Sequence, residues 1–223
     1  MARTISTVSV VDALADDLRR RLFAGDLTSG SPVTEALLTE EYDVARSTSK
    51  AAIEKLTTEG LLQRGAHKRA RVPVLSAEDV HDIYRTRLRL ESSALRELSG
   101  ERRAPAVAIA ANERVRQAGT ATVDSGSIAA VEPDLRFHAS LIEAIGSPRV
   151  ERMYRSLVDE VRLCMAQVQG RSLLSVEQIA DEHQQILEHL QAGDADAAVA
   201  CLEGHLNRAS KRLIDALSLY SAR

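Results

Sequence analysis

The sequence predicts a mainly α-helical protein built from two parts, and three observations lead to this prediction. Aromatic residues are only 3% of the chain and tryptophan is absent, so any apolar core must consist of Leu, Ala, Val and Ile, a mixture that favours helices over sheet. After residue 75 the apolar residues follow long helical repeats with brief breaks between them. Before residue 75 the segments are shorter and turn residues are more frequent. We therefore expect one domain at residues 1–75 and another at residues 76–223.

Charge is distributed unevenly between these two parts. The formal net charge of the chain is −3, yet residues 1–75 hold 11 Lys and Arg against 10 Asp and Glu, whereas residues 76–223 hold 18 against 22. The segment RGAHKRAR at residues 64–71 has four cations and no acid. Such a patch is compatible with contacts to phosphate groups, although a solvated loop has a similar composition.

The chain shows no sign of export or of a membrane anchor. Its apolar runs are short and interrupted by charge, whereas a transmembrane helix needs about 20 apolar residues. The opening segment MARTISTVSV lacks the basic and apolar regions of a secretory signal. We expect a cytoplasmic protein with no membrane partner.

The first part reads as three helices followed by two short strands. Apolar residues recur at helical spacing from Val11 to Leu22, and the segment AGDLTSG ends this helix. A second helix is predicted over TEALLTEEYDV, and a third over ARSTSKAAIEKLTTEG, which Gly60 terminates. The next segment, LLQRGAHKRARVPVL, predicts two strands around a turn at Gly65. This order of elements is that of a winged helix-turn-helix domain.

In a winged helix-turn-helix the recognition helix enters the major groove of DNA, and the residues at its start contact bases and phosphates. Here the helix start reads ARSTSK, in which an arginine can donate two parallel hydrogen bonds and the hydroxyl groups can reach phosphates. A helix start rich in Ser and Thr is, on its own, also typical of an ordinary cap. The predicted DNA contacts are Arg46, Ser47, Thr48 and Lys50 in the helix, and His67, Lys68 and Arg69 in the wing.

The second part predicts an all-helical bundle. Turn residues divide it into amphipathic segments, and Ser76 followed by two acids is typical of a helix start. The expected helices cover residues 76–99, 104–118, 125–145, 148–168, 175–191 and 194–219.

Four side chains of this bundle could form a metal site. Asp134 and His138 are four residues apart, so they lie on one face of a helix. His183 and His205 fall on the last two helices, which a short turn connects, so the four could converge from three helices. One carboxylate and three imidazoles suit Zn²⁺ or Ni²⁺, and Mn²⁺ is acceptable.

The same residues also allow a less specific interpretation. A single helical histidine is more often a surface or core residue than a ligand, and Asp134 could instead pair with Arg136 or Arg152. His189 follows His183 by six positions, which turns it well away from the face of His183, so we expect His189 to be solvated.

Residues 8–75 resemble the winged-helix domain of GntR-type bacterial regulators. The resemblance is carried by LFAGDLTSGSPVTEALLTEEYDVARSTSKAAIEKLTTEGLL and the basic wing after it. The chain departs from the pattern at Ser29, where that family has Pro, at Ala45, where it has Ser, and at residues 49–51, where Ser-Lys-Ala replaces Val-Arg-Glu. A missing Ser cap costs about 1 kcal/mol, so the helix start is expected to shift to Ser47. Because Lys lacks the two-pronged guanidinium of Arg, the usual operator half-site cannot be assumed.

Residues 76–219 resemble the FCD effector domain of the FadR subfamily, and six helices point to its VanR-like branch. The motif is DLRFH, then EHQQILEHLQAGDADAAVACLEGHL, with gaps of 45 and 22 residues between the histidines. This resemblance implies a metal site at Asp134, His138, His183 and His205.

The resemblance also implies a role for Arg87, in the segment DIYRTRLRLESSAL. In such proteins an arginine at this place faces the effector pocket, where it could bind a carboxylate through charge-assisted hydrogen bonds. The alternative is a surface ion pair with Glu91, four residues further along the helix.

Taken together, the resemblance implies a ligand-responsive transcriptional regulator, a repressor, that binds operator DNA as a homodimer. Its effector would be a small organic acid or sugar acid, and a divalent metal would be its cofactor. One alternative is a metal-dependent hydrolase that uses the Asp/His₃ centre, but no general base is evident, since Glu182 points about 100° away from its neighbour His183. Another alternative is a regulator whose site is free of metal and binds an acyl ligand. We expect the protein not to be an enzyme.

Overall fold

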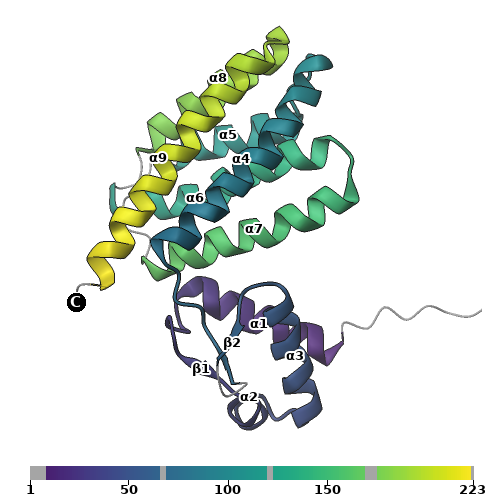
Figure 1. Ribbon diagram of the computed structural model, residues 1–223, viewed down its shortest axis with the longest axis vertical. Helices are drawn as coiled ribbons and strands as arrows, with labels where there is room; N and C mark the ends of the chain where they lie inside the picture. The colour runs from purple at the N-terminus through teal and green to yellow at the C-terminus, as the bar shows by residue number, and fades with distance from the viewer. Residues whose placement is uncertain (1–8, 66–68, 120–122, 169–174, 222–223) are drawn as a thin grey trace, which may run out of the picture. The chain divides into compact units, whose positions relative to one another are not determined.

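The computed structural model describes residues 9–65, 69–119, 123–168 and 175–221. The chain forms two compact units, one that ends at Val74 and one that begins at Leu75. Within the described residues, the first unit contains three helices and a small sheet, and the second contains only helices (Figure 1). The prediction of a mainly α-helical fold is confirmed.

The first unit has the order of elements that the sequence predicts, plus one further strand. β2 and β3 form the expected hairpin, and β1 pairs with the other edge of β3, which gives an antiparallel sheet of order β1-β3-β2. β1 is only two residues long and begins with proline, so it carries no alternating pattern that could predict it. The elements are α1 (Val10–Ala24), β1 (Pro32–Val33), α2 (Glu35–Tyr42), α3 (Arg46–Thr58), β2 (Gln63–Arg64) and β3 (Ala70–Arg71).

Caps and a shared apolar face define the helices of this unit. The Ser9 side chain accepts a hydrogen bond from the Asp12 amide at the start of α1, and Gly25 ends α1 in the left-handed conformation with φ 80°. α1 packs against α3. The core of the unit includes Leu14, Leu18, Leu22, Ile53, Leu56, Leu61, Leu62 and Val72.

The start of α3 differs from the sequence-based expectation. The helix begins at Arg46, not at Ser47, and Ala45 occupies the cap position with φ −62° and ψ 145°. Among the described residues, no side chain caps this end. A missing cap costs only about 1 kcal/mol, whereas burial of the inward face of α3 contributes more, so tertiary packing keeps the first turn helical.

The helices of the second unit lie within two residues of their predicted ends. α4 begins with a capping box, in which Ser76 and Asp79 each accept a hydrogen bond from the other's amide. Pro148 opens α7, and Gly193, with φ 80°, ends α8. The helices are α4 (Ala77–Gly100), α5 (Ala106–Ala118), α6 (Val123–Ala144), α7 (Pro148–Gln167), α8 (Val176–Ala192) and α9 (Ala195–Ser221).

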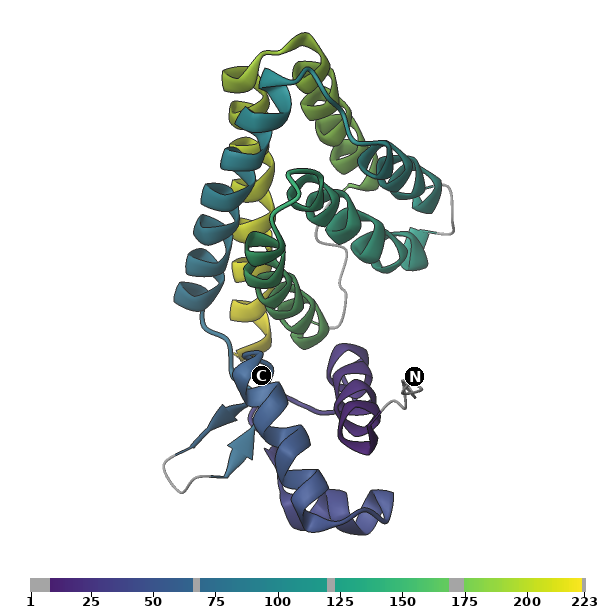
Figure 2. The same cartoon turned by 90° about the vertical axis from the view of Figure 1, so that its right-hand side faces the viewer.

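The packing of this bundle brings distant parts of the chain together. α4 and α9 lie side by side, α5 packs against α6 and α8, and α6 also contacts α4, α7 and α8 (Figures 1 and 2). The core is aliphatic apart from Tyr84, Phe137, Tyr154 and Cys164. None of the helices in the described part of the chain is both long enough and apolar enough to cross a membrane.

We expect Ala45→Ser to stabilise α3, because a serine in this conformation can accept a hydrogen bond from an amide of the first turn. The gain should be about 1 kcal/mol, which slows hydrogen exchange of the α3 amides about fivefold. Mass-spectrometric hydrogen exchange on the full chain measures this effect. Ser76→Ala, which removes an existing cap from α4, should speed exchange there; unchanged exchange in both variants would contradict the assignment of the caps.

Candidate metal centre and nucleic-acid interface

Asp134 and the three histidines meet inside the second unit. α6 supplies Asp134 and His138, α8 supplies His183 and α9 supplies His205, and one ligand atom from each lies within 4.8 Å of all the others. The histidines are buried, and the Asp134 side chain is 20% exposed. The alternative partner Arg136 binds Glu143, so Asp134 is left facing the imidazoles.

The separations within this cluster fit a shared cation. Asp134 Oδ1 lies 3.3 Å from His183 Nε2 and 3.8 Å from the Nε2 atoms of His138 and His205. Two ligand atoms held at about 2.1 Å from one ion can be at most about 4.2 Å apart. These three separations satisfy this limit, and all four ligand atoms lie within 4.8 Å of one another.

Two carboxylates outside the cluster orient two of the histidines. His138 Nδ1 lies 2.6 Å from Glu91 Oε2, and His205 Nδ1 lies 2.9 Å from Glu182 Oε2. Burial raises the pKa of Glu91, but the Arg87 guanidinium and the hydrogen bonds from His138 and Tyr154 outweigh it and hold this pKa at about 2. An ionised carboxylate only accepts hydrogen bonds, so each Nδ1 carries the hydrogen and donates it.

In a neutral ring, this assignment places an acceptor nitrogen, Nε2, on the inner side of the cluster. When Nδ1 of a neutral imidazole carries the hydrogen, Nε2 is an acceptor. His138 Nε2 and His205 Nε2 lie 3.1 Å apart, and burial lowers the pKa of His138, which favours the neutral ring. Two acceptors at this distance repel each other unless a proton or a metal cation lies between them. This is the arrangement in which carboxylates hold the rings of metal-binding histidines.

His183 is the third imidazole of the cluster. Its ring stacks on Phe137, with centroids 3.7 Å apart and planes 7° from parallel. Burial lowers the pKa of His183 to about 3, so the ring is neutral and a lone pair is available. Among the described residues, neither ring nitrogen has a hydrogen-bond partner, and Asp134 stands 3.3 Å from Nε2 without hydrogen-bond geometry. A buried polar group without a partner is rare, and a metal ion bound by these residues would explain it.

The donor set matches the predicted metals. Three imidazole nitrogens and one carboxylate oxygen suit Zn²⁺ and Ni²⁺, while Mn²⁺ is acceptable. Asp134, His138, His183 and His205 would hold the ion. Bound there, such a cation would supply a positive centre that attracts a carboxylate through any remaining coordination position.

Arg87 lies in α4 beside this cluster. Its side chain is only 2% exposed, and its Nε donates to Glu91 Oε1 at 3.0 Å. The ion pair named as the alternative therefore exists, but it is buried and not at the surface. The guanidinium also lies over the Tyr84 ring, 5.1 Å from its centroid. Arg87 Nη2 is buried and has no hydrogen-bond partner among the described residues, which leaves one donor for a ligand.

Four contributors to the site were missed or undervalued in the sequence. Glu91 was considered only as a surface partner of Arg87, and Glu182 only as a catalytic base. Both carboxylates instead hold histidines, and Glu182 also binds Arg208. The helical spacing of Arg87 and Glu91 indicated that they share one face of a helix. Nothing in the sequence pointed to Phe137 or Tyr154 beyond the scarcity of aromatic residues.

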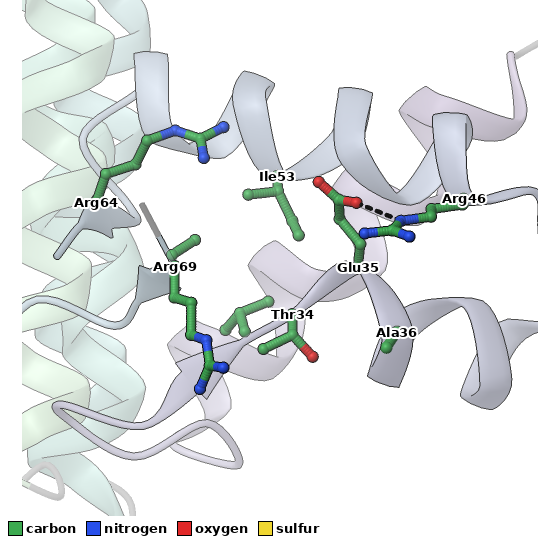
Figure 3. Close-up of a pocket in the computed structure, with 9 residues that line it drawn as sticks. Thr34, Glu35, Ala36, Arg46, Ile53, Arg64 and Arg69 are labelled. Carbon is green, nitrogen blue, oxygen red and sulfur yellow. Dashed lines mark hydrogen bonds and ion pairs between the residues drawn. The ribbon is translucent and has the colours of Figure 1, made fainter. Parts of the chain in front are cut away.

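Two of the predicted DNA contacts, Arg46 and Arg69, line a pocket of about 470 Å³ in the first unit (Figure 3). Arg46 is 81% exposed in its side chain, and its Nε donates to Glu35 Oε2 at 2.7 Å, which leaves both Nη groups for another partner. Arg64 and Arg69 lie on the opposite side of the pocket from Arg46 (Figure 3). The pocket therefore joins the start of α3 to the wing through three cationic side chains.

Of the other predicted contacts, the structure describes three and leaves two undescribed. Ser47 and Lys50 are exposed, Thr48 is half-buried, and Lys50 Nζ lies 3.8 Å from Glu54. His67 and Lys68 lie outside the described residues. The start of α3 has no side-chain cap among the described residues, so its first amides are available to a phosphate.

Comparisons with known proteins agree with both units. Residues 11–72 match the family described as bacterial regulatory proteins, gntR family, and residues 82–208 match the FCD domain. The second match alone covers more than half of the chain. The chain therefore belongs to the gntR family of bacterial regulators and carries an FCD domain.

Relatives extend the similarity over nearly the whole chain. A protein described as "Probable D-xylose utilization operon transcriptional repressor" from Paenarthrobacter nicotinovorans is 23% identical and aligns with 92% of this chain and 89% of its own. The uncharacterized HTH-type transcriptional regulator YdhC of Bacillus subtilis (strain 168) is 22% identical, over 89% and 88%.

Solved structures share the fold. A crystal structure described as a GntR transcriptional regulator from Rhodococcus sp. RHA1 has a TM-score of 0.78 at 20% identity, and covers 92% of this chain and 97% of its own. E. coli McbR/YncC has a TM-score of 0.69 at 19% identity, over 94% and 99%. The family and its relatives establish that this protein is a DNA-binding transcriptional regulator and not an enzyme.

We expect Phe137→Ala to lower the free energy of unfolding by about 3–5 kcal/mol, because it leaves a cavity and removes the ring that stacks on His183. Leu141→Met, a change of similar volume in the same buried helix, should cost less than about 1.5 kcal/mol. Urea unfolding of the second unit, followed by circular dichroism, measures both. Equal losses in the two variants would contradict a special role for the aromatic ring.

Proposed function

We propose that this regulator is a metal-dependent repressor that senses a small carboxylate. The observation that carries the proposal is the pair of Nε2 atoms of His138 and His205, which face each other at 3.1 Å while Glu91 and Glu182 hold the Nδ1 side of each ring. This geometry is unfavourable unless a proton or a metal ion lies between the two nitrogens, and only a metal ion would also engage Asp134 and His183. Zn²⁺ or Ni²⁺ suits the donor set best.

The effector is a small organic acid or sugar acid. A carboxylate can bind both to the metal and to Arg87, whose Nη2 is buried without a partner beside the cluster. Charge-assisted hydrogen bonds from guanidinium to carboxylate are short and strong, especially away from water. A relative described as a repressor of D-xylose utilization supports a ligand from sugar metabolism.

Repression follows from the placement of two α3 helices on DNA. A homodimer places both helices on an operator with two-fold symmetry, in the cytoplasm, and the half-site spacing must match the dimer. Arg46, Ser47, Thr48 and Lys50 contact the major groove, while His67, Lys68 and Arg69 contact DNA from the wing. The effector releases DNA if it binds more tightly to a dimer geometry that no longer matches that spacing.

Replacement of one ligand tests the metal site. We expect His183→Gln to weaken Zn²⁺ binding by more than about 100-fold, because even an outer partner of a metal ligand is worth about 10–100-fold. His189→Gln is the matched control, since His189 lies on the same helix six residues away and should leave the affinity unchanged. Isothermal titration calorimetry with Zn²⁺, together with metal analysis of the purified protein, gives the result.

Two outcomes of this experiment would argue against the proposed site. Equal losses in both variants would place the metal elsewhere. A wild-type protein that binds operator DNA but no divalent metal would favour the metal-free sensor of an acyl ligand.

Replacement of Arg46 tests the DNA interface. With Glu35 on its Nε, Arg46 can offer both Nη groups to one guanine. Arg46→Ala should weaken binding to a selected operator by about 1–3 kcal/mol and abolish the preference at one base pair. Gel-shift titrations against operators with single base changes measure this, with Arg96→Ala in α4 as the control.

A different pattern would reassign Arg46. A uniform loss over all sequences, with a salt dependence lower by about one phosphate contact, would show that it binds the backbone and not a base. No loss at all would remove Arg46 from the interface.

A further inference from the structure

The two carboxylate oxygens of Glu91 accept hydrogen bonds from different buried side chains. Oε1 accepts hydrogen bonds from Arg87 Nε at 3.0 Å and from Tyr154 Oη at 2.6 Å. Oε2 lies 2.6 Å from His138 Nδ1. Glu91 is 0% exposed, and its partners are also buried. One buried carboxylate thus connects a metal ligand to the arginine beside the cluster.

Glu182 provides an internal comparison. It holds His205 in the same way, with Oε2 at 2.9 Å from Nδ1. Its other oxygen, however, binds Arg208, whose side chain is 43% exposed. Solvent screens that arginine, so Glu182 orients a histidine without linking it to a buried cation.

Arg87 has an additional property that points to a ligand. Its Nη2 is buried and lacks a hydrogen-bond partner among the described residues, although Nε is engaged with Glu91. A guanidinium whose Nε is engaged and whose Nη2 has no partner can donate from Nη2 to a carboxylate without losing the first contact.

We infer that Glu91 couples the metal centre to Arg87, so that a carboxylate bound at Arg87 changes how tightly His138 holds the metal. This inference rests on the proposed function, because it describes how the two halves of the proposed site communicate. Glu91 is a positioning residue: it acts on the metal through His138 and on the effector through Arg87.

The coupling follows from how one carboxylate shares its charge. Arg87 draws the charge of Glu91 toward Oε1, which weakens Glu91 as an acceptor for the His138 Nδ1 hydrogen. A ligand carboxylate that neutralises Arg87 returns this charge to Oε2, and a stronger acceptor makes Nε2 of His138 a better metal ligand. Such effects are large where water is excluded. By linkage, the metal must change the affinity of Arg87 for the carboxylate by the same factor.

A double-mutant cycle tests the inference with Zn²⁺ alone, so no effector has to be known. Arg87→Met removes the guanidinium and imitates its neutralisation, and it should tighten Zn²⁺ binding by about fivefold, a coupling typical of residues in contact. Glu91→Gln should weaken Zn²⁺ binding by about 10–100-fold. In the Glu91→Gln background, Arg87→Met should have no further effect. In the Glu182→Gln background, it should keep its full effect.

Calorimetric titration of the full-length variants separates the possible results. Loss of the Arg87→Met effect only in the Glu91→Gln background supports the inference. The same effect in all backgrounds overturns it, because the guanidinium would then act through space. A wild-type protein that binds no Zn²⁺ overturns the proposed function itself, whereas tight binding with an additive cycle overturns only the coupling.

Tyr154→Phe keeps the test valid if Arg87→Met does not fold. It removes a hydrogen bond to the same Oε1 and retains the buried ring. It should tighten Zn²⁺ binding in the wild-type background and have no effect in the Glu91→Gln background. An equal change in both backgrounds would overturn the inference. Thermal melting followed by circular dichroism confirms that each variant is folded.

Discussion

The facing Nε2 atoms of His138 and His205 impose the constraint on which the second unit depends. A bundle with an otherwise apolar core encloses three imidazoles and the three carboxylates of Asp134, Glu91 and Glu182. Burying such groups is favourable only if each finds a partner. Glu91 and Glu182 satisfy the outer nitrogens of two rings, but the inner nitrogens meet one another and Asp134. Both ring nitrogens of His183 lack a hydrogen-bond partner among the described residues, so the side chains alone do not satisfy every polar atom of the cluster.

Much of this architecture could be predicted from the sequence, because local physics determines it. Helical periodicity, capping residues and turn glycines gave the six helices of the second unit within two residues. The i, i+4 spacing of Asp134 and His138 correctly placed both on one face of α6. In the first unit, the basic wing and the three helices could also be predicted from the sequence. The two-residue strand β1 could not, because it carries no periodicity of its own and depends on pairing with β3.

The remainder could not be predicted, because it depends on contacts between helices. Periodicity shows that Arg87 and Glu91 share a face of α4, but not whether that face meets solvent or the cluster. Burial decides between an ordinary surface ion pair and a connection between two binding groups, and burial is a property of the packed bundle. The same holds for Glu182, which points away from His183 along its own helix and yet reaches His205 on the next one. Spacing within the helix showed that Glu182 does not face His183. It could not show that Glu182 contacts His205 on the next helix.

The cluster also explains how a small ligand can act on a whole bundle. Its members come from α6, α8 and α9, while Glu91 and Arg87 come from α4 and Tyr154 comes from α7. A change in the charge of this cluster therefore acts on side chains from five helices. Because a tightly packed core responds by shifting between discrete arrangements and not by gradual deformation, a ligand bound at such a cluster would favour one packing of these helices over another. The binding free energy at a few polar atoms would then shift the equilibrium between two helix arrangements. A regulator requires such a shift of its effector domain.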